Sequence, residues 1–214
     1  MSTDDGRAAP GSPHPDHPPR LVDADAADRI GAEKPGQIDS RTIHDGRVVH
    51  LSMDTVRFPD GSTGELEMIR HSGAAAIVPV LGEPDDPDPE IVLLRQFRYA
   101  AGGEIYEIPA GRPDRPGEPW KDVARRELEE ETGWVAGHLR RLNTIYTTPG
   151  FTDERIHIFL ATDLHQGTTD LDPDEFVEAV TLPLSDVRDA IRHGRIIDAK
   201  SVAGLLWFAR FGRG

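Results

Sequence analysis

Residues 118–134 have the sequence EPWKDVARRELEEETGW, a pattern that predicts an amphipathic helix. Proline is favourable at the start of a helix and glycine just beyond its end. We therefore expect the helix to run from after Pro119 to Glu131 and to stop at Gly133. At the helical period of 3.6 residues, an apolar strip that can pack on a sheet is formed by Trp120, Ala124 and Leu128.

Three glutamates share a second face of this helix, because Glu127, Glu130 and Glu131 lie at positions i, i+3 and i+4. Like charges at this spacing repel each other by roughly a few tenths of a kcal/mol per pair. The compensating charge is expected from Arg126 or from a divalent cation, since clustered carboxylate oxygens are hard ligands that suit Mg²⁺. From the carboxylates alone, a solvated acidic helix face is an equally good interpretation.

The segments on either side of this helix have mostly strand-like patterns. Strands are predicted at 48–58, 64–71, 74–81, 91–97, 104–109, 142–147, 156–161 and 176–184. Residues 59–62, Pro-Asp-Gly-Ser, form a turn that makes the first two strands a hairpin. Two helices are expected to close the chain, at 185–192, with Ser185 as the cap, and at 199–211. Strands, one helix, strands and then helices predict an α+β fold, an αβα sandwich with a mixed sheet.

Composition limits the classes of partner. The chain has 214 residues, with 24 Lys and Arg against 38 Asp and Glu, and a formal charge of −14. This charge argues against electrostatic binding of nucleic acid or anionic lipid. The absence of cysteine excludes disulfides, thiolate zinc sites and a cysteine nucleophile, and it favours a cytoplasmic protein. The apolar runs are far shorter than the roughly 20 residues that span a bilayer, so we expect a soluble protein without a membrane partner.

Three regions are expected along the chain. Residues 1–36 hold six of the eighteen prolines and few large apolar side chains, a composition typical of a disordered tail. They lack the apolar segment of a signal peptide, and we expect them to be dispensable for activity. Residues 37–72 form N-terminal strands, and residues 73–214 form the main domain.

A longer motif surrounds the acidic helix. Gly111, Glu118 and the run Arg126-Glu-Leu-x-Glu-Glu-x-Gly-Trp134 resemble the signature of the Nudix hydrolases, which is Gly-x5-Glu-x7-Arg-Glu-U-x-Glu-Glu-x-Gly-U, with U a bulky apolar residue. The one departure is a spacing of six residues instead of five between Gly111 and Glu118. It lies in the loop before the helix, where an added residue leaves the helix register unchanged.

The resemblance implies the αβα fold and a divalent metal centre, with Mg²⁺ or Mn²⁺ as the cofactor. The metal ligands that it implies are Glu127, Glu130, Glu131 and the backbone carbonyl of Ala110. Arg126 is expected to hold the glutamates through a salt bridge, and Arg126 and Glu130 to contribute to catalysis. Glu118 lies at the edge of the site or serves as a charge at the helix N-terminus. An acidic protein can bind an acidic diphosphate through interposed cations, which also orient a water molecule and lower its pKa.

Features outside the helix resemble the ADP-ribose pyrophosphatases of this family. They are Arg95-Gln-Phe-Arg98, the run Glu107-Ile-Pro-Ala-Gly111, and Pro149, sixteen residues after Gly133. On this resemblance Arg98 clamps the diphosphate, Glu107 assists near the metals and Pro149 lies in the substrate site. Alternatively, Pro149 belongs to an ordinary Pro-Gly turn; Arg95 is assigned to folding.

The residue that activates water is expected on the acidic loop 172–178. Glu175 fits best by its place before a predicted strand, Asp174 comes second, and a glutamate of the helix is a further alternative. Such a loop can close over substrate, although it is also compatible with a solvated acidic segment.

The expected activity is Mg²⁺-dependent hydrolysis of ADP-ribose to AMP and ribose 5-phosphate. Two alternatives stay open: hydrolysis of another nucleoside diphosphate sugar or of NADH, and, in another functional class, a module that senses ADP-ribose without cutting it. The resembled enzymes are commonly homodimers, and the strands within 48–71 are the expected contact.

Overall fold

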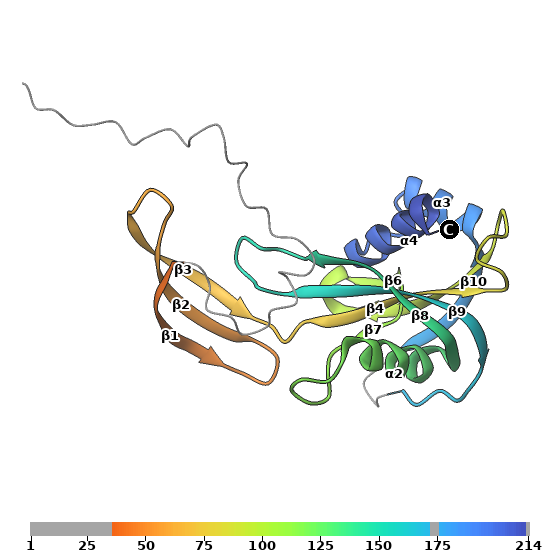
Figure 1. Cartoon of the computed structure of the whole chain (residues 1–214), viewed down its shortest axis with the longest axis horizontal. Coiled ribbons are helices and arrows are strands. Elements are labelled where there is room, and N and C mark those ends of the chain that lie inside the picture. The colour runs from red at the N-terminus through yellow and green to blue at the C-terminus, as the bar shows by residue number, and fades with distance from the viewer. Residues whose placement is uncertain (1–35, 172–175, 213–214) are drawn as a thin grey trace, which may run out of the picture. The chain divides into compact units, whose positions relative to one another are not determined.

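The computed structural model describes residues 36–171 and 176–212, and the chain divides into two compact units, Met1–Met68 and Ile69–Gly214. The described part of the first unit is a sheet in the order β1-β2-β3 (Figure 1). Its strands are β1 (Gln37–Asp45), β2 (His50–Arg57) and β3 (Thr63–Arg70), which ends just inside the second unit.

The predicted hairpin corresponds to β2 and β3. The turn between them is closed by the amide of Phe58, which donates to the Ser62 carbonyl over 2.8 Å. By contrast, the sequence pattern did not indicate β1, which pairs antiparallel with β2. All nine residues of β1 are exposed, so this strand lacks the buried, alternating apolar face that identifies most strands.

The second unit is built on one mixed sheet. Among the described residues its order is β10-β5-β4-β9-β8, with β6 beside β5 and β7 beside β4. The bounds are β4 (Ala74–Leu81), β5 (Glu90–Arg98), β6 (Gly103–Glu107), β7 (Ala110–Gly111), β8 (Trp134–Tyr146), β9 (Arg155–Gln166) and β10 (Val177–Pro183). β4 runs parallel to β9, whereas the other pairings are antiparallel. The mixed sheet that was predicted is therefore present.

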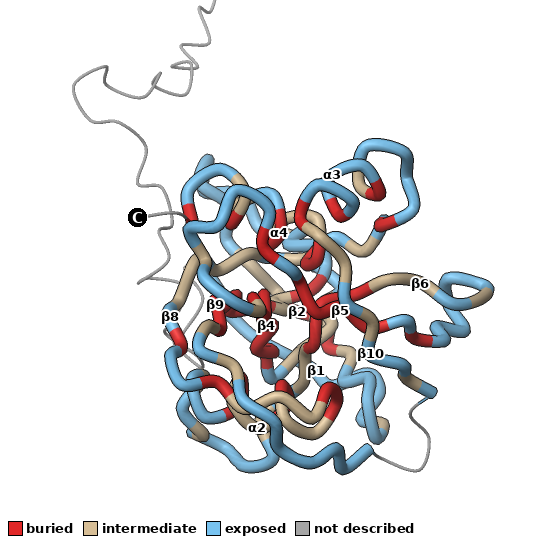
Figure 2. Tube along the Cα trace, turned by 90° about the vertical axis from the view of Figure 1, so that its right-hand side faces the viewer, coloured by how far each residue is buried: buried red, intermediate tan, exposed pale blue. Residues whose placement is uncertain are grey.

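Helices cover both faces of this sheet (Figure 1). They are α2 (Trp120–Thr132) on one side and α3 (Leu184–Arg192) and α4 (Ala199–Phe211) on the other, and a short 3₁₀ turn, Tyr99–Ala101, follows β5. Alternate residues of β4 pack in opposite directions: Ala75 and Ile77 against α2, and Val78 and Val80 with the core of α3 and α4. Figure 2 shows the buried chain concentrated along β4 and β5. The predicted αβα sandwich is confirmed.

The helix limits agree closely with expectation. α2 ends where glycine was predicted to stop it, since Gly133 has φ of 71° and its amide donates to the Glu129 carbonyl. α4 has the predicted limits. One helix cap is wrong: α3 follows Pro183, and Ser185 instead donates through its amide and hydroxyl to the Asp88 carboxylate.

The later strands are longer than predicted. β8 begins at Trp134 instead of residue 142, and β9 continues to Gln166. In β9 the polar residues Arg155 and His157 are buried like their apolar neighbours, because the sheet is covered on both faces. Within residues 36–171 and 176–212, no helix has the length and apolar character needed to cross a bilayer.

Candidate active site

A cavity of about 1190 Å³ opens in the second unit and brings together residues from several elements. Carboxylates come from α2, from the end of β6 and from the residue before α4, and cationic groups come from β5, α2 and α4. The lining includes Arg98, Glu107, Ala110, Gly111, Arg126, Glu127, Glu130, Asp198 and Lys200. Opposite charges therefore face one open cleft that has room for a ligand the size of a nucleotide.

Arg126 lies at the centre of the acidic cluster on α2. One nitrogen, Nη1, is 2.9 Å from Oε1 of Glu127 and 2.8 Å from Oε2 of Glu130. Nε pairs with Asp114 at 3.1 Å, and Nη2 donates to the carbonyl of Arg112. Burial opposes the charge on Arg126, but the surrounding carboxylates outweigh it and raise the pKa of this guanidinium. Three carboxylates, two of them on Nη1, thus contact one permanent cation.

Glu118 organises the loop that precedes α2. Its Oε2 accepts a hydrogen bond of 2.9 Å from the Asp114 amide, and its Oε1 lies 3.8 Å from Nε of Arg126. Gly117 has φ of 78°, a left-handed conformation that suits glycine. The structure therefore places Glu118 beside the cluster, where it closes the longer loop.

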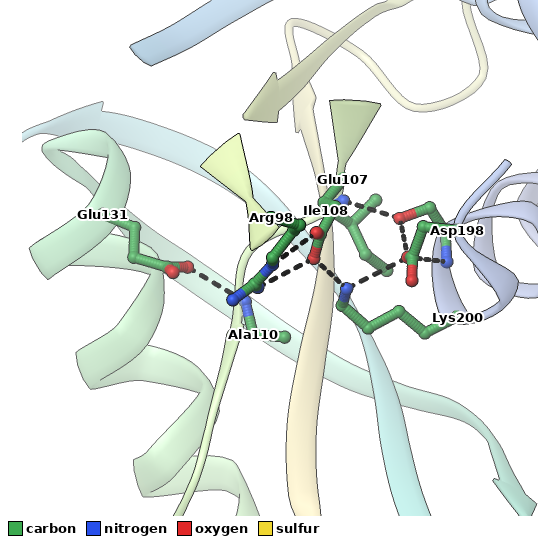
Figure 3. Close-up of polar contacts among 8 residues, drawn as sticks. Arg98, Glu107, Ile108, Ala110, Glu131, Asp198 and Lys200 are labelled. Carbon is green, nitrogen blue, oxygen red and sulfur yellow. Dashed lines mark hydrogen bonds and ion pairs between the residues drawn. The ribbon is translucent and has the colours of Figure 1, made fainter. Parts of the chain in front are cut away.

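The segment Glu107–Gly111 joins the two charged walls of the cavity (Figure 3). The amide of Ile108 donates to Oγ of Ser201 over 2.8 Å, and the carbonyl of Pro109 accepts from Ile77. The amide of Ala110 donates to Oε2 of Glu131 over 2.9 Å. Ile108, Pro109 and Ala110 are consequently held by α4, β4 and α2 in turn.

Arg98 and Glu107 form a two-point ion pair. Nε and Nη2 of Arg98 donate to the two oxygens of Glu107 over 2.7 and 3.0 Å, and Lys200 pairs with the same carboxylate. Glu107 is 3 % exposed. Burial opposes its ionisation, but the hydrogen bonds from Arg98 and the charge of Lys200 outweigh burial and lower the pKa of Glu107. Arg98 is thus fixed in place, while half of its side chain faces solvent.

The predicted residues divide into three groups by position. Arg98, Glu107, Ala110, Arg126, Glu127 and Glu130 line the cavity. Glu131 is buried behind it against Ala110, and Pro149 lies in an exposed turn outside the lining. Glu175 and Asp174 fall outside the described residues. Arg95 pairs with Glu178 and Glu104 on neighbouring strands, in keeping with the folding role assigned to it.

Sequence reasoning missed other groups in the same cavity. Lys200 and Asp198 come from the start of α4, and His71 lies 3.5 Å from Glu154 on another part of the lining. The only local signal for the first pair was the cap of α4, in which Asp198 accepts from the Ser201 amide. The contact of Lys200 with Glu107 spans more than ninety residues and has no local sequence pattern.

Comparison with known proteins identifies the family. The model of the NUDIX domain matches residues 70–201. The chain belongs to the Nudix family. The expected resemblance is confirmed, and the acidic helix α2 with its preceding loop is the Nudix motif of this chain.

Curated Nudix relatives cover most of the chain. It is 37% identical over 166 residues to the ADP-ribose pyrophosphatase of Bacillus subtilis strain 168, an alignment that covers 77% of this chain and 86% of the relative. It is 39% identical over 167 residues to the methanol dehydrogenase activator of Bacillus methanolicus, with coverage of 77% and 87%. A crystal structure of an ADP compounds hydrolase has a TM-score of 0.71 at 24% identity, covers 85% of this chain and 98% of its own, and supports the fold. The family model and these relatives identify the protein as a Nudix hydrolase.

Nudix hydrolases generally use divalent metal ions, and the donors present here fit such an ion. The carboxylates of Glu127 and Glu130 converge on a single positive nitrogen, and carboxylate oxygens suit hard cations. Gly111 leaves room for the Glu127 carboxylate, since a Cβ at residue 111 would lie 2.0 Å from that carboxyl group. Among the described residues no group of three or more His, Asp or Glu side chains is arranged so that it could hold a metal ion, so the fit rests on the chemistry of the Glu127 and Glu130 carboxylates.

The close approach of Gly111 to Glu127 makes a testable prediction. Gly111→Ala is expected to destabilise the protein by about 1–3 kcal/mol, because the methyl group overpacks against the carboxylate. The displaced carboxylate should lower kcat/KM by roughly 10–100-fold. Chemical denaturation and steady-state kinetics measure the two effects. Gly103→Ala is the control, since nothing lies within 4 Å of its added Cβ, and equal behaviour of both variants would contradict the steric argument.

Proposed function

We propose that this Nudix hydrolase is a Mg²⁺-dependent ADP-ribose diphosphatase that releases AMP and ribose 5-phosphate. The observation that carries the proposal is that one cavity holds the cations Arg98 and Lys200, each paired with a carboxylate, together with the carboxylates Glu127 and Glu130 of α2. A diphosphate requires cations on both sides, from guanidinium or ammonium groups and from metal held by carboxylates. The choice of ADP-ribose follows the name of the Bacillus subtilis relative.

In this proposal the metal ligands are Glu127, Glu130, Glu131 and the carbonyl of Ala110. Of these, Glu127, Glu130 and Ala110 line the cavity. A bound divalent ion supplies charge neutralisation at the phosphoryl oxygens and lowers the pKa of a water molecule. Arg126 keeps Glu127 and Glu130 together, since its Nη1 contacts both carboxylates.

The protein groups then position the reactants. Arg98 binds a phosphoryl oxygen with guanidinium donors other than the two that contact Glu107. Glu107 fixes that guanidinium, and Pro149 shapes the approach of the substrate. The oxygen of water forms a bond to one phosphorus as the bridging P–O bond breaks, and the proton of water passes to a carboxylate, which we assign to Glu175. Asp174 and Glu130 are the alternative bases.

A substrate panel tests this activity. The purified full chain with Mg²⁺ is expected to release AMP from ADP-ribose with a higher kcat/KM than from NADH, an ADP-hexose or GDP-mannose. Chelation by EDTA should abolish release and added Mg²⁺ should restore it. Faster cleavage of another compound would assign the enzyme to that substrate, and tight binding of ADP-ribose without cleavage would indicate a sensing module.

We also propose a cytoplasmic homodimer that associates through residues 37–72. The exposed apolar side chains of this unit support it: Ile38, Ile43, Val48, Val49, Phe58 and Leu66. Multi-angle light scattering should give twice the mass of one chain, and a monomer at micromolar concentration would contradict the proposal.

A further inference from the structure

Lys200 is a cation in the cavity wall that the Nudix motif does not include. It lies in the first turn of α4, is 9 % exposed, and lines the same cavity as Arg98. A buried ammonium group requires partners. Lys200 has two, the carboxylate of Glu107 and that of Asp198, whose Oδ2 is 3.0 Å from Nζ.

The four charged groups of this wall balance one another (Figure 3). Arg98 and Lys200 carry two positive charges, and Glu107 and Asp198 carry two negative ones. Without Lys200, one guanidinium would face two carboxylates, and the wall would have a net charge of minus one. The guanidinium would then be drawn between the carboxylates, and an anionic diphosphate would meet repulsion at this wall.

The backbone fixes Lys200 relative to Glu107. Ser201, which is completely buried, accepts a hydrogen bond of 2.8 Å from the amide of Ile108 and donates its hydroxyl to Asp198. The start of α4 is thereby attached to the residue next to Glu107. Arg98 and Lys200, which are far apart in the sequence, consequently pair with the same carboxylate, that of Glu107.

We propose that Lys200 is a positioning residue that balances Glu107 and Asp198, and so keeps Arg98 at the cavity wall for the diphosphate of the substrate. This rests on the proposed function, because it assigns Arg98 to diphosphate binding. Lys200 acts on affinity for the ground state and the transition state alike, since it does not touch the reacting atoms. The effect should appear in KM and leave kcat nearly unchanged.

The first experiment measures the effects on KM and kcat separately. Lys200→Met is expected to raise KM for ADP-ribose about 10-fold, with kcat within about twofold of the wild-type value. Arg95→Met is the matched control, because it removes a cation from the same strand as Arg98 that pairs with carboxylates outside the cavity. An unchanged KM in Lys200→Met, or an equal rise in both variants, would overturn the inference.

A double-mutant cycle tests whether Lys200 acts through Arg98. In an Arg98→Met background, adding Lys200→Met is expected to change the affinity for ADP, measured by calorimetry, by less than about threefold. A full 10-fold loss in that background would show that the two residues act independently and would refute the proposal.

A charge-compensated double variant tests the inference even if the single variant Lys200→Met does not fold. The double variant Asp198→Asn/Lys200→Met restores a neutral wall, and asparagine caps a helix as well as aspartate. Its affinity for ADP is expected to return to within about threefold of wild type, and a persistent 10-fold loss counts against the inference.

Measuring ADP binding distinguishes failure of this inference from failure of the proposed function. If the wild-type chain cleaves no ADP-ribose, the proposed function is refuted, while the ADP affinities of the variants still decide the role of Lys200.

Discussion

Replacing Glu130 with glutamine should lower kcat for ADP-ribose by about 10²–10³-fold at saturating Mg²⁺. The substitution removes a negative charge from the pair of carboxylates that converge on Arg126, and glutamine is a weak ligand for a hard cation. The fold should survive, because the side chain is about one-third exposed and glutamine keeps an oxygen that accepts from Arg126. We expect unfolding free energy within about 1 kcal/mol of wild type.

Glu129→Gln supplies the matched control for this prediction. Glu129 belongs to the same helix but does not line the cavity, so its substitution should leave kcat within about twofold. Steady-state kinetics with a Mg²⁺ titration measures both variants. If Glu130→Gln retained full turnover at the wild-type Mg²⁺ concentration, the assignment of Glu130 to the metal site would be wrong.

Replacing Arg126 with methionine should reduce stability by about 2–4 kcal/mol and kcat by about 10²-fold. Its removal leaves the carboxylates of Asp114, Glu127 and Glu130 close together without their shared cation. Mutual repulsion then destabilises the fold and disperses the oxygens that the proposed metal requires. A divalent ion can replace part of the missing charge, so Mg²⁺ should raise the unfolding midpoint of this variant more than that of wild type.

The neighbouring arginine provides the comparison. Arg125 donates to the Ala136 carbonyl and lies outside the cavity lining, so Arg125→Met should cost about 1 kcal/mol and leave kcat and the response to Mg²⁺ unchanged. Thermal unfolding with and without Mg²⁺ distinguishes the two variants. An Arg126→Met protein as stable as Arg125→Met would show that the carboxylates do not depend on Arg126.

Local patterns predicted the central elements of this fold because each has its own sequence signal. The helix α2 combines a proline start, an apolar strip and the left-handed Gly133, and β4 is a continuous apolar run that is buried on both faces. β1 has neither signal, because all of its residues are exposed. The prediction of Ser185 as the cap of α3 was wrong for a different reason: Ser185 bonds to Asp88, a partner almost one hundred residues away.

The candidate site also has parts that local sequence predicts and parts that depend on distant contacts. Residues on one helix face, such as Glu127 and Glu130, could be grouped by period alone, and the contacts of Arg126 with them follow from adjacency. The contacts of Lys200 and Ser201 with Glu107 and Ile108 depend on how α4 packs against the end of β6, which tertiary structure alone determines. For Glu131 the helical period was not sufficient. It groups Glu131 with the other two glutamates, but in the structure the Glu131 carboxylate accepts a hydrogen bond from the Ala110 amide and does not line the cavity.

The anchoring of Glu107–Gly111 has a consequence for how this protein tolerates changes of length. Because consecutive residues contact Arg98, Ser201, Ile77 and Glu131 in turn, one inserted residue would shift every later partner out of register. The adjoining loop 112–117 already contains one residue more than the Nudix signature, and it accommodates that residue through a glycine turn. A one-residue change of length is therefore better accommodated near Gly117, at the end of this loop, than between Glu107 and Gly111, where each residue has its own fixed partner.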